Sequence, residues 1–447
     1  MSVNSLAVVA GVAGVRTAAM YLTAEELGRK RKDHVIWVLS ACFLYSILCS
    51  CGAAAVLFGS APRIAALWIG TPRSAQALRL FAMFLPVLCL ANVMTGYFTA
   101  ANRIGTLAAV EVAEQLLSMG ITLLALHFFA GSDPVRACQC IILGSCSAAC
   151  FTLLCLVSLR LREPSSPALR LPVGRRLVDI AVPLALADIL KSGINTIENL
   201  MVPKRLALNP RIADPLASFG IVSGMVFPIL MFPACILYGL AELLIPELAR
   251  CAAAGSNGRI SYLVQKGLRI SLLYGFLVGG LEYLLAKPLC IRLYSNPEAG
   301  NFLCLYSTLI PMLYCDAITD SMTKGLGQQK ICVRYNILTS TLDVIFLWLW
   351  LPKYGLKGYF ASFAVTHLLN FLLSLRLLLK ITGEHIPFHL PALTCSAVVV
   401  AVWGAGFFSG TAGKIIAYLL LLGSLCCLLQ ITGREDLLWM KGMLRKK

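Results

Sequence analysis

Two stretches of the chain, LTAEELGRKR (residues 22–31) and LIPELARCAA (residues 244–253), lie about 221 positions apart, and each ends an apolar segment and begins a connection. A second pair keeps nearly the same offset, since FLPVLCLANVMTGYFTAANRI (84–104) resembles LIPMLYCDAITDSMTKGLGQQKI (309–331). A near-constant offset between matched segments is typical of an internal repeat. The sequence therefore predicts a chain built from two related halves.

The apolar segments around these stretches are long enough to cross a membrane. Of the 447 residues, 59% are hydrophobic and 13% are charged, and the mean hydropathy is +0.81. A membrane helix needs about 20 apolar residues, because it must cross about 30 Å of hydrocarbon at about 1.5 Å per residue. We predict an all-α polytopic membrane protein of about thirteen transmembrane helices, at 3–23, 35–59, 77–99, 107–129, 136–159, 177–202, 216–246, 260–286, 301–324, 331–351, 356–380, 390–408 and 413–432.

Pairing the two halves leaves the first half one helix short. The second copy begins with the segment at 177–202, which has no counterpart in the first. A repeat of six spans returns the chain to its starting side, so the copies have the same orientation. We therefore predict a fourteen-helix, two-lobe fold lacking its first helix: an N-terminal lobe at 1–160, a cytoplasmic linker at 161–176, a C-terminal lobe at 177–382, two additional helices at 388–433 and a basic cytoplasmic tail at 434–447.

The net charge of +17 is a sign of membrane topology rather than of nucleic-acid binding. Of the 38 Lys and Arg residues, 24 lie in the C-terminal tail and in alternate connections, beginning with the one after the first span, while the other connections hold 12. Cytoplasmic loops carry an excess of these residues. The bias places these connections and the C-terminus in the cytoplasm, with some attraction to anionic membrane lipid.

Neither the cysteines nor the known catalytic motifs point to an enzyme. Most of the 18 cysteines lie inside predicted spans, and none forms a pattern with zinc-ligand spacing. The sequence contains no phosphate-binding glycine loop, no H-E-x-x-H and no G-x-S-x-G. We expect no metal site, no cofactor and no enzymatic activity.

The segment DILKSGINTIENLMVPKRL (188–206) places a polar face inside a predicted span. Its polar residues advance by three or four positions and so share one side of a helix: Asp188, Lys191, Asn195, Glu198 and Asn199. An ionised group at the bilayer centre costs at least about 2.5–3.5 kcal/mol, so this face avoids lipid. We interpret it as the lining of a transport cavity. The alternative is a structural network in which Lys191 pairs with Asp188 or Glu198.

Arg16 lies midway along the first span, in GVAGVRTAAMY (11–21), with no acidic residue within one turn. Together with Lys191 it puts one cation in each predicted lobe, which favours an anion site. The planar guanidinium suits phosphate oxygens, and a lysine adds a compact charge. The alternative is that Arg16 extends its side chain to the membrane surface.

For the other acidic residues inside predicted spans, the sequence allows more than one role. Glu111 and Glu114, one turn apart, could bind a coupling proton or sodium ion, or could join two helices. Asp316 is a further candidate for the coupling ion, whereas Asp320 suits a solvated helix end.

Asn336 and Asp343 are seven residues apart and share a face, which predicts that both line the same cavity. No role is assigned to Glu242 and Glu282.

Several motifs resemble one family when taken together. They are NTIENLMVP (195–203), IPELAR (245–250), YSNPEAG (294–300), KGLGQQ (324–329), RYNILTS (334–340), KYGLKGY (353–359) and LLNFLLSLRLLL (368–379). They are similar to the stage V sporulation protein B-like branch of polysaccharide exporters, within the multidrug/oligosaccharidyl-lipid/polysaccharide (MATE-like) flippase superfamily. GVAGVRTAAMYLTAEELG (11–28) resembles the second helix of that family.

This resemblance implies two six-helix lobes around a central cavity, with alternating access. The implied cargo is a lipid-linked oligosaccharide or peptidoglycan precursor, for cell wall, spore cortex or surface polysaccharide. Arg16 and Lys191 would hold the lipid diphosphate, and the two additional helices would frame a groove for the lipid tail. The expected setting is the bacterial cell membrane, with the protein as a monomer and H⁺ or Na⁺ as a possible partner.

Two other functions remain open at this point. One is a cation-coupled multidrug antiporter of the same superfamily, which Arg16 and Lys191 disfavour because such pumps carry cations. The other is a non-transporting membrane scaffold for wall synthesis, in which the cavity charges would be dispensable.

Overall fold

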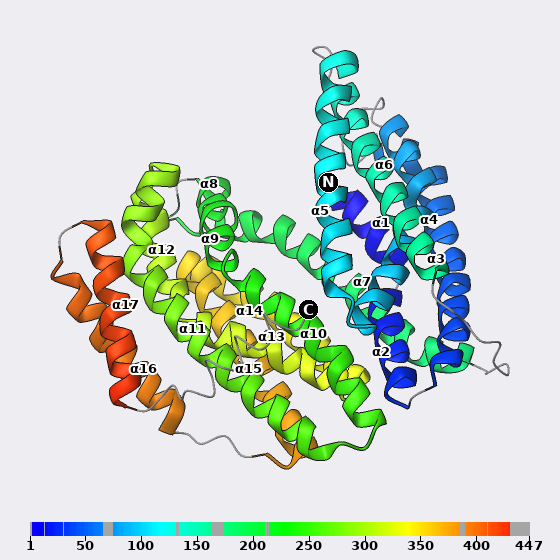
Figure 1. Ribbon diagram of the computed structural model, residues 1–447. Helices are drawn as coiled ribbons and strands as arrows, with labels where there is room; N and C mark the ends of the chain where they lie inside the picture. The colour runs from blue at the N-terminus through cyan, green and yellow to red at the C-terminus, as the bar shows by residue number, and fades with distance from the viewer. Residues whose placement is uncertain are drawn as a thin grey trace. The chain divides into compact units, whose positions relative to one another are not determined.

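The computed structural model describes residues 2–12, 14–29, 31–65, 75–130, 134–162, 173–210, 212, 214–384, 389–408 and 410–429. All regular secondary structure in this part of the chain is helical (Figure 1). The all-α fold class predicted from the apolar segments is therefore confirmed.

The first half of the chain forms seven α-helices. They are α1 (Ser2–Val12), α2 (Val15–Gly28), α3 (Val35–Ile64), α4 (Ala75–Ala100), α5 (Ile104–Ala125), α6 (Pro134–Leu161) and α7 (Val173–Leu206). A short 3-10 turn, Lys32–His34, precedes α3, and a π-helical turn, Leu126–Ala130, extends α5. The first predicted span is divided at Gly14 into α1 and α2.

Among its described residues, the second half contains two bent spans and five further helices. The first bent span consists of α8 (Pro215–Gly220), a π-helical turn (Ile221–Val226), α9 (Phe227–Met231) and α10 (Ala234–Ala253), and the second of α12 (Pro297–Ser307) and α13 (Ile310–Gly325). They bend by 62° and 54°. The others are α11 (Asn257–Tyr294), α14 (Gln329–Tyr354), α15 (Leu356–Thr382), α16 (His389–Gly406) and α17 (Thr411–Leu428).

These helices make the chain a multi-pass membrane protein. Among the described residues, nine helices are long and apolar enough to cross a membrane, or up to eleven if each bent pair is one span. The helix α7, with its charged residues, is not among them, and α16 is shorter than the others. The prediction of thirteen spans is compatible with this arrangement and stays a prediction.

The chain divides into two compact units. Unit 1 contains Met1–Thr196, Ile245–Ser256 and Gly325–Ile337, and unit 2 contains Ile197–Leu244, Asn257–Lys324 and Leu338–Lys447. The predicted tail at 434–447 and most of the predicted linker at 161–176 lie outside the described residues. The predicted lobe boundaries stay predictions.

In unit 1, the two repeated stretches pack against each other. A Cβ atom at Gly28 would lie only 2.5 Å from the carbonyl oxygen of Arg250. Each stretch also forms the same kind of local ion pair, at 2.7 Å between Arg29 and Glu25 and at 3.0 Å between Arg250 and Glu247. The two stretches thus lie side by side, a glycine permits the close approach, and the repeat itself stays a prediction.

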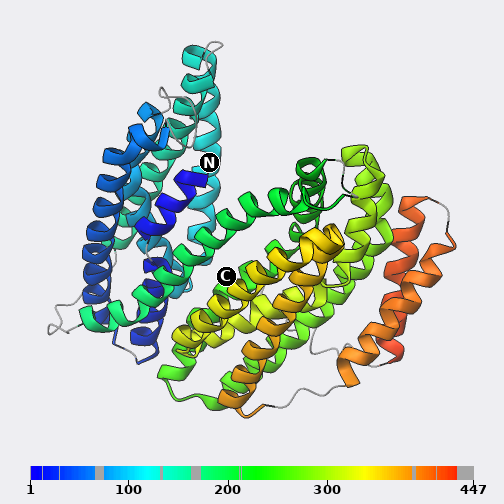
Figure 2. The same ribbon diagram turned by 180° about the vertical axis from the view of Figure 1, so that it is seen from behind.

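In unit 2, α16 and α17 form a hairpin that packs along α11 (Figure 2). The Tyr418 hydroxyl of α17 donates to the carbonyl oxygen of Leu277 at 2.9 Å. Gly280 leaves room for this ring, since a Cβ atom there would overlap the Tyr418 hydroxyl. The contact holds the additional hairpin against α11.

The predicted orientation of the spans can be tested with reporter fusions. We expect a reporter fused after Ser165 to be cytoplasmic and one fused near Pro297 to be external, because Lys and Arg concentrate on the side that holds residue 165. Paired alkaline phosphatase and green fluorescent protein fusions would measure this. The opposite signals would contradict both the helix count and the repeat.

Candidate functional site

The break in the first span determines where Arg16 lies. Gly14 has a φ of 70°, a conformation that glycine adopts without strain, and it ends α1 and begins α2. Arg16 therefore falls in the first turn of α2. Helix N-termini attract anions, because their first N–H groups lack partners in the helix and carry a partial positive charge. A broken membrane helix that ends near an anionic group is a recurrent design of transporters.

Two neighbouring helices hold this N-terminus in place. A Cβ atom at Gly14 would lie 2.7 Å from the Ala181 carbonyl oxygen, so α7 touches the break itself. A Cβ atom at Gly96 would lie 2.6 Å from the Arg16 carbonyl oxygen, so α4 packs against the same turn. Glycine at these two positions permits the close packing of α7 and α4 on α2.

The contact at Gly14 brings Arg16 and Lys191 to adjacent helices within unit 1. Lys191 follows Ala185, another contact of Gly14, by six residues, which is about 9 Å along a helix. Lys191 and Asp188 are both exposed. The backbone of α7 therefore places Lys191 one to two turns away from the start of α2.

A second contact fixes α7 to α2 at the other end of α2. Arg176 of α7 donates to Glu25 at 2.5 Å and lies 3.7 Å from Glu26. Both glutamates are buried, and His34 lies 3.4 Å from Glu26. The helices that carry Arg16 and Lys191 therefore contact each other at both ends of α2.

The other polar residues predicted to line the cavity from α7 are Asn195, Glu198 and Asn199. Asn195 and Asn199 have side chains outside the described part of the structure. Glu198 belongs to unit 2 and hydrogen-bonds the side chain of Asp343 on α14. Asn336, seven residues before Asp343 on α14, is half-buried.

The Glu198–Asp343 pair is the centre of a polar cluster in unit 2. Asp343 Oδ1 accepts hydrogen bonds from Ser362 Oγ at 2.5 Å and from Thr366 Oγ1 at 3.2 Å, both on α15. A hydrogen bond between two carboxyl groups requires one shared proton, because two adjacent carboxylates repel each other. This cluster can bind either a proton or a small cation that replaces it.

A third carboxylate joins the cluster through α15. Asn370 Nδ2 donates to both carboxylate oxygens of Asp316, at 3.1 and 3.0 Å, and Thr339 Oγ1 donates to Asn370 Oδ1 at 3.5 Å. Asp320, by contrast, pairs with Lys324 at 2.6 Å near the end of α13. The buried partner distinguishes Asp316 from the more exposed Asp320 pair.

Sequence reasoning missed the helix that connects these carboxylates. Four buried polar residues follow one side of α15 at intervals of four: Ser362, Thr366, Asn370 and Ser374. That spacing was visible in the sequence, because residues four apart share a helix face. Uncharged polar residues are common in membrane helices, however, so their presence in a span indicates a functional site less strongly than a lysine does.

Glu111 and Glu114 lie on α5 in unit 1. Glu114 accepts a hydrogen bond from Thr152 of α6 at 2.8 Å, and Thr152 is buried. This contact corresponds to the alternative in which the glutamate joins two helices. Glu111 is exposed, and a role in ion coupling stays a prediction for both residues.

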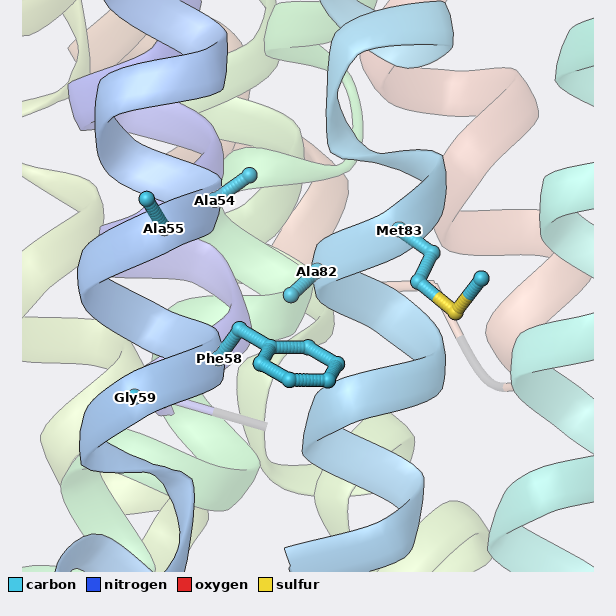
Figure 3. A pocket seen from close by; sticks show the side chains of 6 residues that line it. All are labelled: Ala54, Ala55, Phe58, Gly59, Ala82 and Met83. Atoms are coloured by element: carbon cyan, nitrogen blue, oxygen red, sulfur yellow. The ribbon is translucent and has the colours of Figure 1, made fainter.

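Two cavities lie away from the polar residues described above. One, of about 380 Å³, lies between α3 and α4, where the Phe58 ring and the Met83 side chain mark its edges (Figure 3). The other, of about 440 Å³, is a mainly apolar groove in unit 2 between α11, the α12–α13 bend and α16. Within the described residues, no group of three or more His, Cys, Asp or Glu is arranged to hold a metal ion.

Both sequence and structure resemble known proteins. Residues 23–209 match the family of polysaccharide biosynthesis proteins. Stage V sporulation protein B of Bacillus subtilis (strain 168) is 19% identical over 371 residues, which cover 80% of this chain and 71% of that protein. Sporulation protein YkvU of the same organism is 22% identical over 227 residues, 49% of this chain and 51% of YkvU.

Solved structures with the same fold are transporters. The MATE transporter VcmN of Vibrio cholerae matches with a TM-score of 0.69 at 15% identity, over 85% of this chain and 86% of that one. This chain has the MATE transporter fold. A second match is a MOP superfamily transporter from Pyrococcus furiosus, described as having a binding pocket of reverse polarity. It has a TM-score of 0.66 at 12% identity, over 85% of this chain and 86% of that one.

The matches confirm the resemblance to polysaccharide biosynthesis proteins and to stage V sporulation protein B, and the fold is MATE-like. At these identities the solved structures establish the fold alone.

Proposed function

We propose that this protein exports a lipid-linked oligosaccharide or peptidoglycan precursor across the bacterial cell membrane by alternating access. The sequence matches to polysaccharide biosynthesis and sporulation proteins support this class of cargo. The MATE transporter fold supports a transport function.

The observation that carries the proposal is the position of Arg16 in the first turn of α2, beside α7. In this proposal Arg16, the α2 N-terminus and Lys191 bind the diphosphate of the lipid. Guanidinium and ammonium groups form short, charge-assisted hydrogen bonds with phosphate oxygens. Outward movement of a diphosphate across an inside-negative membrane also releases about 2.3 kcal/mol per charge per 100 mV.

The polar cluster of unit 2 supplies the proposed coupling site. Glu198 and Asp343 would bind a proton or a sodium ion, with the hydroxyl oxygens of Ser362 and Thr366 as further ligands. Carboxylate and hydroxyl oxygens suit both ions. Asp316, tied to the same helix by Asn370, is the next candidate.

The apolar groove beside α16 is proposed to hold part of the lipid tail. It is lined by Phe276, Val398, Val402 and Trp403 among others, and its lining is mainly apolar. An acyl or polyprenyl chain fits such a surface, because burying apolar area is favourable and needs no polar partner.

The anion site can be tested with single substitutions. We expect Lys191→Ala and Arg16→Ala each to weaken binding of a short-chain polyprenyl diphosphate by about 10- to 100-fold, because a hydrogen bond to a charged group contributes about 1.5–3 kcal/mol. Lys191→Arg should keep most of the affinity, since a cation of similar reach remains. Isothermal titration calorimetry on the purified protein, followed by export assays in vesicles, would measure this.

Lys204→Ala is the matched control, because Lys204 is an exposed residue of the same α7 helix and its loss changes the net charge equally. Its affinity should be unchanged. Wild-type affinity in Lys191→Ala and Arg16→Ala would exclude the anion site. If vesicles instead accumulated a lipophilic cation and ignored the diphosphate, the multidrug antiporter alternative would be favoured, and export that survives loss of both cations would favour a scaffold role.

A further inference from the structure

Glu282 of α11 is a buried acid that the proposed transport site does not use. Its exposed fraction is 6%, and neither carboxyl oxygen has a hydrogen-bond partner within the described part of the chain. It lies toward the end of the predicted span at 260–286. An ionised carboxylate in such a place would lose its hydration without compensation.

The ionisable groups around Glu282 do not neutralise a negative charge. The ionisable groups close enough for a charge on Glu282 to act on them are Tyr274 and Cys290 of α11 and Tyr314 of α13. On the other helices that pack against α11, Cys304 of α12 is bonded to a carbonyl oxygen of α11, and so is Tyr418 of α17.

The nearest charged residue along the helix, Lys287, is exposed. None of these groups is a buried cation. An ionised carboxylate at Glu282 would therefore have neither a hydrogen-bond donor nor a buried cation among the described residues to stabilise it.

Both bent spans of unit 2 meet α11 close to Glu282. A Cβ atom at Gly275 would lie 2.7 Å from Pro311 Cα, and one at Gly279 would lie 3.0 Å from the Ser307 carbonyl oxygen, so the α12–α13 bend packs directly on α11. The two tyrosines near Glu282 reach the other bend: Tyr274 donates to the Pro233 carbonyl oxygen at 2.9 Å, and Tyr314 donates to that of Leu230 at 3.3 Å.

We propose that Glu282 is a proton-binding site, separate from the Glu198–Asp343 pair, whose proton exchanges with water only when the bent spans beside it move. The ligand is a proton rather than a metal ion, because the groups around the carboxyl supply no second acid. Movement of α9 against α10, or of α12 against α13, would open the packing that excludes water. Helix breaks are the points at which a span can bend without losing further backbone hydrogen bonds.

Infrared difference spectroscopy of the purified protein tests the protonation state directly and does not depend on any substrate. We expect the wild type to show the carbonyl stretching band of a protonated, weakly hydrogen-bonded carboxyl group, and Glu282→Gln to lose it. Glu198→Gln is the matched control and should keep this band. A spectrum that Glu282→Gln leaves unchanged would overturn the proposal.

Deuterium exchange of the same band tests the link to the bends. In D₂O the band of the wild type should shift slowly, and Tyr314→Phe should shift at least several-fold faster, because it removes the hydrogen bond to Leu230. Tyr283→Phe is the control, since Tyr283 follows Glu282 but is exposed and lines the apolar groove. Equal exchange rates in all three proteins would show that the bends do not control access.

An export assay separates this site from the proposed transport function. Glu282→Gln mimics the neutral state, so we expect normal amounts of folded protein and wild-type binding of the polyprenyl diphosphate, with export reduced at least tenfold. If Glu282→Gln lost the infrared band but exported at the wild-type rate, export would not depend on proton exchange at Glu282, and that part of the proposal would be wrong. Failure of diphosphate binding in the wild type, with the band present, would count against the proposed cargo alone.

Discussion

Asp343→Ala is expected to abolish coupled export while leaving the protein folded. The substitution removes the carboxyl group that binds Glu198, Ser362 and Thr366, so the proposed cation loses its main ligand. Truncating one member of a buried charged pair costs about 2–5 kcal/mol of binding, and about 2.8 kcal/mol already corresponds to 100-fold. We therefore expect export driven by a proton or sodium gradient to fall by about 100-fold or more in reconstituted vesicles.

Folding should survive this change because the hydroxyl groups have other acceptors. Thr366 Oγ1 already lies 2.9 Å from the Ser362 carbonyl oxygen, and Ser362 Oγ lies 3.3 Å from that of Asp343. Neither hydroxyl donor is therefore left without a partner, which is the usual cause of a large loss of stability.

Asp179→Ala is the control, since Asp179 is 59% exposed and its contact with Lys330 is long, at 3.8 Å. It should export normally, because exposed ion pairs contribute little. If Asp343→Ala still exported at the wild-type rate under a proton or sodium gradient, the Glu198–Asp343 pair would not be the coupling site.

Gly14→Val is expected to be the most destabilising single substitution in unit 1. The φ of 70° at Gly14 is strained for any residue with a Cβ atom and worst for a β-branched one. The new Cβ atom would also lie 2.8 Å from Leu184 Cβ and 2.7 Å from the Ala181 carbonyl oxygen. Strain of this kind costs about 1–3 kcal/mol and overpacking a similar amount, so we expect a loss of about 3 kcal/mol or more.

Denaturant unfolding in detergent and the amount of protein in membranes would measure this loss. Gly120→Val is the matched control: Gly120 lies on α5, and a Cβ atom there would meet nothing within 4 Å. It should unfold like the wild type. If Gly14→Val were equally stable, the break between α1 and α2 would not depend on glycine, and the position of Arg16 would need another explanation.

The membrane class and the helices could be read from the sequence, because both depend on local composition. A run of about 20 apolar residues specifies a span wherever it occurs. The likeness between the stretches at 22–31 and 244–253 was also visible, and the two stretches pack together at Gly28 and Arg250. Periodicity likewise placed Glu198 on a polar face and Asp343 on a second one.

Periodicity shows which side of a helix a residue occupies but not what lies opposite. The bond between Glu198 and Asp343 joins residues 145 positions apart, and only the packing of α7, α14 and α15 brings them together. The same holds for Asp316 and Asn370. The sequence offered Glu282 as one more acid in a span, and its burial without a partner became visible only in the folded protein.

By itself, the sequence determined that this is an all-helical, multi-pass membrane protein, because hydropathy is a property of the chain. The tertiary structure decided that the first span breaks at Gly14, that Arg16 begins a helix beside α7, and which acids share a cluster. The physical reason is that membrane helices associate through close packing and polar contacts between distant segments. Those contacts depend on the shapes of both partners, which no single stretch of sequence contains.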